Sequence, residues 1–506
     1  MIPPTMLPVA AAFTWRPLVP ELLLLGAILI LPLLGLTMRG ERGSQDMGRM
    51  TAMVLAGALF VTAFNLIRGT LIGTPIDIAG YDALYQVDAF SQFLKIVFLG
   101  VAFLVALGSI EYARTFPAPI EYYTLLLTAT VGMMVVASAR DLITLFIGIE
   151  TTSLSSYILA GYRKRNRFGI EAATKYFIIG ALSSAIFLYG ISLLYGIAGT
   201  TRFDALSAGI DGSAGMTAMT LVAIVFIVAG IGFKISAAPF HMWAPDVYHG
   251  APDTVAGFLS AGSKAMGFAA AFKIFVVGLA AARAEWDALV AIIAILSMTI
   301  GNVIALRQTS LKRMLAYSSI AQAGYLLIAV VVATEYAVAG GLYHLVTNGI
   351  MKVTAFLAIA AIAAYGLGDR LDDYKGLRLR SPLIALVMAV MLLSLAGVPP
   401  FGGFVSKFAL FSSAIYGSTE TGRDWLVWLA VAGIVNSLVS LFYYVRIVRY
   451  MYAEAPEETS RLRLTPATNA ALIAGLVLIV LVGVWPDLVW SHAVEAAASL
   501  VASGTP

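Results

Sequence analysis

Apolar runs of about 20 residues recur along almost the whole chain, and this pattern constrains the fold more than any other feature. A helix of about that length crosses the roughly 30 Å of hydrocarbon in a bilayer. Only 12% of the residues are charged, about half the share typical of soluble proteins. We therefore predict an all-α polytopic membrane protein with about fourteen transmembrane helices. The expected spans are residues 17–38, 48–67, 88–110, 121–139, 141–160, 171–196, 217–239, 255–280, 288–306, 313–333, 336–365, 382–414, 425–452 and 466–490.

Basic residues gather in every second loop. Most arginines follow odd-numbered spans, as Arg163 and Arg167 follow the fifth span and Arg461 and Arg463 the thirteenth. Positively charged loops stay in the cytoplasm, so this bias predicts that both termini lie on the non-cytoplasmic side. A bacterial inner membrane is the expected location. The first run lacks a small-residue cleavage site, so we interpret it as a retained span, with a cleaved signal as the alternative.

Several classes of function are excluded by what the sequence lacks. The chain has no cysteine, so it cannot ligate an iron–sulfur cluster through thiolates or form a disulfide. No GxxxxGK[ST] phosphate loop is present. Of the four histidines only His344 falls within a span, which argues against a bis-histidine haem. The net charge of +4 gives no support for nucleic-acid binding. We therefore expect no cofactor in this chain, and energy for any transport must come from partners.

Lysines and arginines are placed differently. Nearly all arginines lie in loops or at span ends, whereas seven lysines fall within or beside apolar segments: Lys95, Lys175, Lys234, Lys264, Lys273, Lys352 and Lys407. A buried lysine can lose its proton, whereas arginine stays charged. The sorting therefore favours residues that load and unload protons.

The position of each lysine within its span suggests its role. Lys264 and Lys352 sit near mid-span, where a charge is costly unless it has a partner or a hydrated cavity. Lys95, Lys175 and Lys273 lie nearer span ends, where snorkelling to the interface is the alternative interpretation. The acidic counterpart is Glu150, near the centre of the fifth span.

Two spans carry prolines that should break them. The seventh has Lys234 five residues before Pro239, and the twelfth has Lys407 seven residues after Pro400. Proline removes an amide donor, and broken helices in a membrane line cavities or ion paths. The opposite order of lysine and proline predicts two five-helix repeats inserted in opposite senses. The expected division is 1–120 for helices 1–3, 121–280 for helices 4–8, 288–452 for helices 9–13 and 466–490 for helix 14.

Several blocks of sequence resemble the antiporter-like membrane subunits of respiratory complex I, and among them the N-type subunit. The resemblance runs from about residue 85 to residue 450 and is densest in GMMVVASARDLITLFIGIETTSLSSYILAGY (132–162), EAATKYFIIGALSSAIFLYGISLLYGIAGTT (171–201), FKISAAPFHMWAPDVYHGAP (233–252), NVIALRQTSLKRMLAYSSIAQAGYLL (302–327) and SLAGVPPFGGFVSKF (394–408). It implies a fourteen-helix subunit with two inverted five-helix repeats and with helices 7 and 12 broken.

The resemblance also implies roles for individual residues. The family's helix-5 glutamate falls on Glu150, and its helix-7, helix-8 and helix-12 lysines fall on Lys234, Lys264 and Lys407. A lysine at the last position is the N-type pattern. The sequence departs from the family at Gln322, where many relatives have histidine. In the eleventh span, His344 and Lys352 are similar to the L- and M-type pattern, while Asn348 replaces its second histidine.

A single proton pathway along a mid-membrane row is the expected mechanism. Glu150 would pair with Lys234, and opening this pair would release a proton along the row. Lys264 would be the next carrier, with Ser260 and Ser263 beside it. Lys352 and His344, eight residues apart, share a helix face and would connect the row to Lys407, the terminal donor.

His241, just beyond the seventh-span break, is either a proton relay or an interfacial histidine without a role.

The resemblance places the redox chemistry in partner subunits. FMN, iron–sulfur clusters and quinone would be bound there, and the partners would include another antiporter-like subunit, the small K-, J- and A-type membrane subunits, and lipids. Two alternatives remain open. One is a subunit of a multisubunit cation/proton antiporter, and the other is a scaffold subunit that moves no protons.

Overall fold

The computed structural model describes residues 16–38, 40–72, 84–116, 118–163, 166–212, 218–456 and 460–503. Within these ranges the chain is helical, with three isolated β-bridges and no longer strand. The α-helices are α1 (Val19–Gly35), α2 (Gly40–Ile72), α3 (Ala89–Tyr112), α4 (Pro119–Ser138), α5 (Leu142–Ala160), α6 (Arg167–Ala198), α7 (Phe203–Gly212), α8 (Ala218–Lys234), α9 (Trp243–Gly250), α10 (Asp253–Phe258), α11 (Lys264–Ala271), α12 (Arg283–Ala305), α13 (Leu311–Val332), α14 (Glu335–Ala363), α15 (Leu377–Arg380), α16 (Pro382–Ala396), α17 (Gly402–Thr421), α18 (Leu426–Ala453), α19 (Pro466–Val484) and α20 (Asp487–Ala502).

Every expected span corresponds to a helix or a pair of helices. Among the described residues, eleven helices are long and apolar enough to cross a membrane, and the shorter apolar helices α1, α8 and α16 account for the remaining runs. The chain is thus an all-α multi-pass membrane protein, as predicted. Four helices fall mainly outside the expected spans: α7 and α15 lie in loops, α9 lies between the seventh and eighth spans, and α20 follows the last span.

The two predicted breaks are present. In the seventh span α8 ends at Lys234, Ser236 adopts a positive φ of 55°, and α9 begins at Trp243. In the twelfth span α16 ends at Ala396, and the chain turns at Gly397 with a φ of 90°, a conformation that favours glycine. Each break ends a helix inside the protein, where its last carbonyls need donors from elsewhere.

The most buried helices lie at the centre of the bundle. The segment Asp253–Gly278 is buried throughout, and α13 and α14 are almost completely buried. In this central segment the π-helical turns Leu259–Ser263 join α10 to α11, and the π-helical turns Phe272–Gly278 follow α11. Large apolar side chains are exposed on α1, α2, α6 and α18, as expected for helices that face lipid.

Glycines allow two pairs of helices to approach closely. A Cβ at Gly132 of α4 would lie 2.8 Å from the carbonyl oxygen of Gly148 in α5. In α13, a Cβ at Gly324 would lie 2.7 Å from the carbonyl oxygen of Ala294 in α12. Small residues at such crossings are typical of membrane helix pairs, because close backbone contact replaces the hydrophobic driving force that lipid removes.

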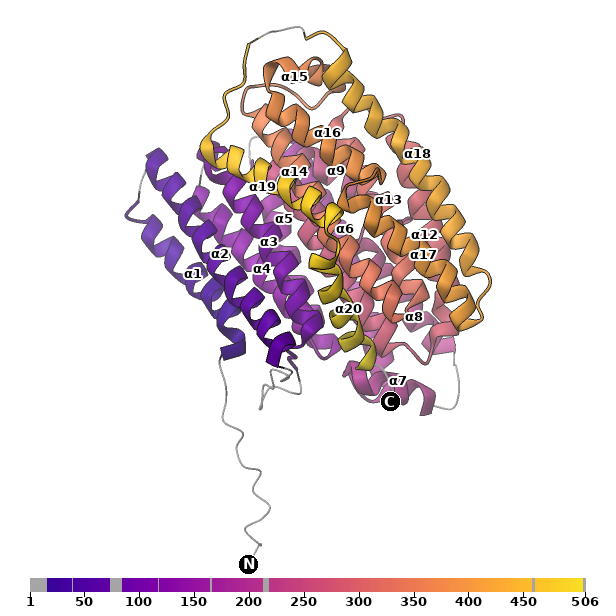
Figure 1. Ribbon diagram of the computed structural model, residues 1–506. Coiled ribbons are helices and arrows are strands. Elements are labelled where there is room, and N and C mark those ends of the chain that lie inside the picture. The colour runs from indigo at the N-terminus through magenta and orange to yellow at the C-terminus, as the bar shows by residue number, and fades with distance from the viewer. Residues whose placement is uncertain are drawn as a thin grey trace, which may run out of the picture.

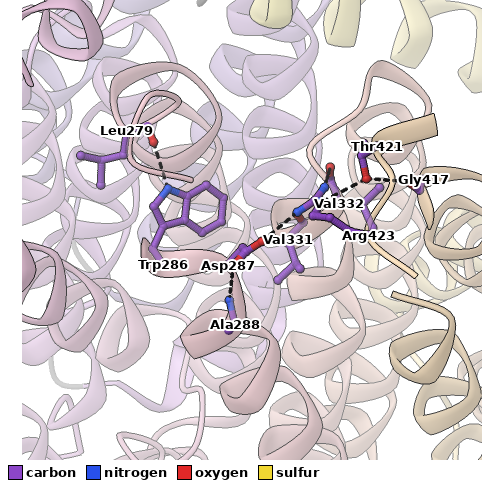
Figure 2. Close-up of polar contacts among 9 residues, drawn as sticks. All are labelled: Leu279, Trp286, Asp287, Ala288, Val331, Val332, Gly417, Thr421 and Arg423. Carbon is purple, nitrogen blue, oxygen red and sulfur yellow. Dashed lines mark hydrogen bonds and ion pairs between the residues drawn. The ribbon is translucent and has the colours of Figure 1, made fainter. Parts of the chain in front are cut away.

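One arginine binds three helices together at one end of the second half of the chain (Figure 2). The Arg423 guanidinium forms an ion pair with Asp287 of α12 at 3.2 Å. It also donates to the carbonyl oxygens of Val331 and Val332 at 3.0 and 2.9 Å, and to the Thr421 hydroxyl at 3.0 Å. Arg423 therefore supplies the donors that the end of α13 lacks.

The two ends of the molecule are built differently (Figure 1). The short helix α7 lies at one end, where α20 also ends, and α15 lies at the opposite end. The sequence-predicted cytoplasmic loops, including the one that carries α15, gather at the end opposite α7.

Candidate functional site

Lys234 is the last residue of α8 and lies at the break in the seventh span. Its side chain is 5% exposed, and its ammonium donates to the Ser153 hydroxyl of α5 at 2.5 Å. That hydroxyl donates in turn to the carbonyl oxygen of Ile149. Among the described residues no carboxylate lies within ion-pair distance of Lys234. Its hydrogen-bond partner is therefore neutral.

Glu150 lies on the same helix as Ser153 and three residues before it, so the two share a face. The Ser184 hydroxyl of α6 donates to its carboxylate at 2.6 Å. The direct Glu150–Lys234 ion pair expected from the sequence is not formed in this structure. The residue of α5 that Lys234 contacts is Ser153, one turn after Glu150.

Lys264 begins α11, directly after a π-helical turn, and its side chain is 1% exposed. Its ammonium donates to the carbonyl oxygen of Ser319 in α13 at 2.6 Å. The hydroxyl of Ser260, one turn before Lys264, donates to the carbonyl oxygen of Gly257.

Lys234 packs against the helix that carries Lys264. A Cβ at Gly267, one turn after Lys264, would lie 3.3 Å from Cγ of Lys234. The absence of a side chain at Gly267 therefore leaves room for the Lys234 stem. This contact connects the broken seventh span to the central buried segment.

Lys352 lies on α14 and is completely buried. Its ammonium donates to the Ser318 hydroxyl at 2.7 Å and to the carbonyl oxygen of Leu315 at 2.9 Å, both on α13. The Ser318 hydroxyl also forms a hydrogen bond with Tyr444 of α18. Lys352 is thus held by neutral oxygens, as are Lys234 and Lys264.

Lys407 lies on α17 and reaches back to the break in the twelfth span. Its ammonium donates to the carbonyl oxygen of Ala396, the last residue of α16, at 3.1 Å, and to the Ser437 hydroxyl at 2.9 Å. It also lies 5.0 Å from the centre of the Tyr325 ring. A cation at the C-terminal end of a helix interacts favourably with the helix dipole.

One face of α13 connects three of these lysines. Leu315 and Ser318 bind Lys352, Ser319 binds Lys264, and the Tyr325 ring lies beneath Lys407. Ser318 and Ser319 are consecutive, so the ammonium groups of Lys264 and Lys352 meet adjacent positions on α13. Lys264 and Lys352 therefore bind neighbouring residues of one helix.

The two candidate histidines lie in different surroundings. His344 of α14 is completely buried, and its Nδ1 forms a hydrogen bond of 3.0 Å with the hydroxyl of Ser406, the residue before Lys407. Its Nε2 has no partner among the described residues. His241 lies in the seventh-span break, is half-buried, and has an unpartnered Nδ1. His344 therefore contacts the helix that carries Lys407.

The three lysines nearer span ends differ in burial and in their partners. Lys95 is completely buried and forms an ion pair of 2.7 Å with Glu21 of α1. Lys273 is buried and donates to the carbonyl oxygen of Ala139 at 2.6 Å. Snorkelling is therefore wrong for both. Only Lys175 is exposed, at 41% of its side chain, and it pairs there with Asp246 at 2.6 Å.

Two carboxylates that the sequence reading overlooked join the halves of the chain. Asp246 of α9 binds Lys175 of α6 and also Arg313 of α13, the latter at 3.0 Å. Asp253, at the start of α10, pairs with Lys312 of α13 at 2.9 Å. The sequence could have indicated these ion pairs, because an acidic residue close to a broken helix in an apolar segment is costly without a partner.

The described residues contain no group of three or more His, Asp or Glu side chains that could hold a metal ion. The site is therefore a set of buried lysines bound by hydroxyls and backbone carbonyls. The oxygens of these groups accept hydrogen bonds from the lysine ammonium groups.

Residues 139–438 match the family described as NADH:quinone oxidoreductase/Mrp antiporter, TM. The chain is 42% identical to F(420)H(2) dehydrogenase subunit N of Methanosarcina mazei, covering 96% of this chain and 98% of that protein. It is 40% identical to NADH-quinone oxidoreductase subunit N of Desulforamulus reducens, covering 86% and 89%. In respiratory complex I from Thermus thermophilus with bound aureothin, a 32% identical chain superimposes with a TM-score of 0.77, covering 93% and 98%. The chain therefore belongs to the NADH:quinone oxidoreductase/Mrp antiporter family of transmembrane subunits.

Proposed function

We propose that this chain is the N-type antiporter-like subunit of a quinone-reducing respiratory complex and that it translocates protons through its buried lysines. The observation that carries the proposal is the shared face of α13, which contacts Lys264, Lys352 and Lys407. The names of the relatives, both subunit N of a dehydrogenase or oxidoreductase, support the assignment to such a complex. Redox chemistry in partner subunits would drive the transport.

The neutral partners of the row lysines suit proton exchange. A serine hydroxyl accepts from an ammonium and donates to the neutral amine that remains when the proton leaves. Lys234, Lys352 and Lys407 each have such a hydroxyl, from Ser153, Ser318 and Ser437. Neither protonation state therefore leaves these nitrogens without a hydrogen bond.

Lys95 provides the contrast within the same chain. Its ammonium contacts the Glu21 carboxylate, which also accepts a hydrogen bond of 2.6 Å from Tyr85. Discharging Lys95 would leave a buried carboxylate without its counter-charge, which is costly. A lysine held in this way is a structural cation, whereas the row lysines are free to discharge.

A transport cycle follows from these contacts. A change in the charge of Glu150, or in its distance from Lys234, would alter the hold on the Lys234 proton. The proton would pass to Lys264, which lies one turn from the Lys234 contact at Gly267, and then across α13 to Lys352. Lys407 would release it, with His344 connected to this end of the row through Ser406. His241 would serve as a relay at the seventh-span break.

The remaining features of the proposal concern the surroundings of the chain. The row would run through two oppositely inserted five-helix units, residues 121–280 and 288–452. FMN, iron–sulfur clusters and quinone would reside in partner subunits, next to another antiporter-like subunit and the small membrane subunits. A cell inner membrane, with both termini on the non-cytoplasmic side, agrees with the distribution of basic loops.

Replacing the row lysines tests the proposal. In the assembled complex reconstituted into vesicles, Lys264→Met and Lys407→Met should abolish proton pumping while the subunits still co-purify. Lys264→Arg and Lys407→Arg should also fail, since arginine keeps the charge but does not discharge. Lys95→Arg is the matched control, because it places the same bulky group at an equally buried site outside the row.

Each outcome has a definite meaning. Loss of pumping in the Arg variants of the row, with pumping retained in Lys95→Arg, supports proton exchange at the row. Full proton-to-electron stoichiometry in Lys264→Met and Lys407→Met would mean that the chain is a scaffold.

A multisubunit cation/proton antiporter is the second candidate, because the matched family includes Mrp antiporters. It predicts sodium flux without quinone reduction and co-purification with membrane subunits alone.

A further inference from the structure

A large cavity lies away from the lysine row, where three helices end or begin. Its volume is about 1190 Å³, and it lies between the last turns of α3 and α14 and the start of α19. One wall is formed by the alanines of α14, Ala360, Ala361, Ala363 and Ala364. Their small side chains leave space that larger residues would fill, and they make this wall apolar.

Two arginines line the same cavity. Arg163 lies in the loop before α6, and Arg463 lies in the segment before α19. Neither guanidinium has a hydrogen bond or an ion pair with a side chain or carbonyl in the described parts of the chain. Arg163 lies over the Tyr112 ring, 4.9 Å from its centre, and Arg463 is exposed.

The acidic lining residue is already engaged. Glu111 forms an ion pair of 2.8 Å with Arg114 and accepts a hydrogen bond of 3.0 Å from Gln45. It is therefore not available to neutralise Arg163 or Arg463. Two cations facing one cavity without counter-charges favour an anionic occupant.

The first turn of α19 adds polar groups to the same cavity. Thr465 is the N-cap residue of α19, and both Thr465 and Thr468 line the cavity. The N-terminal end of a helix carries partial positive charge, so it adds to the attraction for an anion. The polar groups and the apolar wall therefore occupy different parts of one space.

The cavity lies at the level where membrane helices end. Its lining comes from the ends of spans 3 and 11 and from the loops after spans 5 and 13, all at the end of the molecule opposite α7. This is the depth of lipid headgroups. Basic pockets between helices at that depth suit the headgroups of anionic lipids.

We propose that this cavity binds an anionic phospholipid. Arg163 and Arg463, with the start of α19, hold the phosphate, and the alanine wall of α14 packs against the glycerol and the first part of an acyl chain. A free phosphate ion would satisfy the arginines but leave the apolar wall uncovered. A phospholipid matches both parts of the cavity.

The experiment uses the full chain purified in detergent from membranes that contain anionic lipid. In the double variant Arg163→Gln, Arg463→Gln the amount of phosphatidylglycerol or cardiolipin that co-purifies with the protein should fall at least tenfold. Lipid extraction and native mass spectrometry measure this amount. Arg461→Gln is the matched control, because it removes a cation two residues from Arg463 that does not line the cavity. It should retain the lipid.

A second variant fills the space without changing charge. Ala361→Phe should displace the lipid while both arginines remain, and thermal unfolding curves should show that each variant stays folded. Phosphatidylglycerol added to delipidated wild-type protein should bind to it, whereas added phosphatidylcholine and inorganic phosphate should not bind. Equal lipid retention in the double variant, or displacement of the lipid by inorganic phosphate, would overturn the proposal, as would a protein segment found in the cavity of the assembled complex.

Discussion

The buried ion pair between Lys95 and Glu21 predicts a strong energetic coupling that can be measured. The two side chains are 0% and 8% exposed, and the atoms that join them are 2.7 Å apart. Replacing one partner leaves the other charge buried and uncompensated, a change that costs about 3–5 kcal/mol in comparable sites. In a membrane the unfolded reference state keeps some of its contacts, so the lower end of that range, about 3 kcal/mol, is expected.

The perturbation is a double-mutant cycle. Lys95→Met and Glu21→Gln should each lower the free energy of unfolding by about 3 kcal/mol, a change of roughly a hundredfold in the folded-to-unfolded ratio. The double variant should cost much less than the sum, because no uncompensated charge remains. The Tyr85 hydroxyl, which donates to Glu21 in the wild type, keeps an acceptor in the Glu21→Gln variants.

The assay is unfolding of the detergent-purified chain by heat or by increasing denaturant, with all four proteins under the same conditions. An interaction energy of about 2 kcal/mol or more between the two sites is expected. Strictly additive losses would refute the reasoning, since they would mean that the two charges are stabilised separately. Proton pumping in the assembled double variant should remain normal, because this pair lies outside the lysine row.

Three further changes probe other parts of the structure. Gly403→Ala places a Cβ 1.9 Å from the backbone oxygen of Ser394, so α16 and α17 must separate at the twelfth-span break. The free energy of unfolding should fall by about 1–3 kcal/mol, which should appear as a lower melting temperature. Arg423→Gln removes the donors to a buried carboxylate and to the end of α13 and should destabilise the chain by about 2 kcal/mol or more in denaturant titrations. The hydrogen bond from Arg202 holds the pKa of Asp204 below its ordinary value, so the ionised carboxylate contributes stability at neutral pH that is lost only below about pH 4. The difference in stability between wild type and Asp204→Asn should therefore shrink on acidification through that range, and a difference that stays constant from neutral pH to pH 3 would contradict this.

The spans and their breaks could be predicted because their causes are local. A run of apolar residues specifies a membrane helix by its length, and Pro239 and Pro400 interrupt their helices wherever the neighbours lie. The helix α20 was not predicted, because it lacks such a local signal. Its sequence, DLVWSHAVEAAASLVA, mixes charged and apolar residues over a length too short to signal a span, and its position is set by packing against α3 and α14.

The partners of the charged residues could not be predicted because they depend on which helices meet. Lys95 of α3 and Glu21 of α1 are 74 positions apart in the sequence, yet their side chains form an ion pair. Lys234 was expected to bind Glu150, but the helix face that carries Glu150 also presents Ser153, and the ammonium binds that hydroxyl. A flexible four-carbon stem can reach several neighbours on one face, so residue type and spacing narrow the choice without deciding it.

Lys95 is paired with a carboxylate and the lysines of the row are not, and this difference suggests how a row of like charges can transport protons. Lys352 and Lys264 bind the consecutive residues Ser318 and Ser319 of α13, and ammonium groups in a weakly screened interior repel one another strongly. In the proposed transport, a proton that arrives at one lysine would therefore favour departure from its neighbour, provided that each site can hold either form. Carboxylates beside every lysine would remove this repulsion and fix all the charges at once. In the proposed pathway, the absence of close carboxylates from these lysines, among the described residues, would let a change of charge at one end of the row affect the other end.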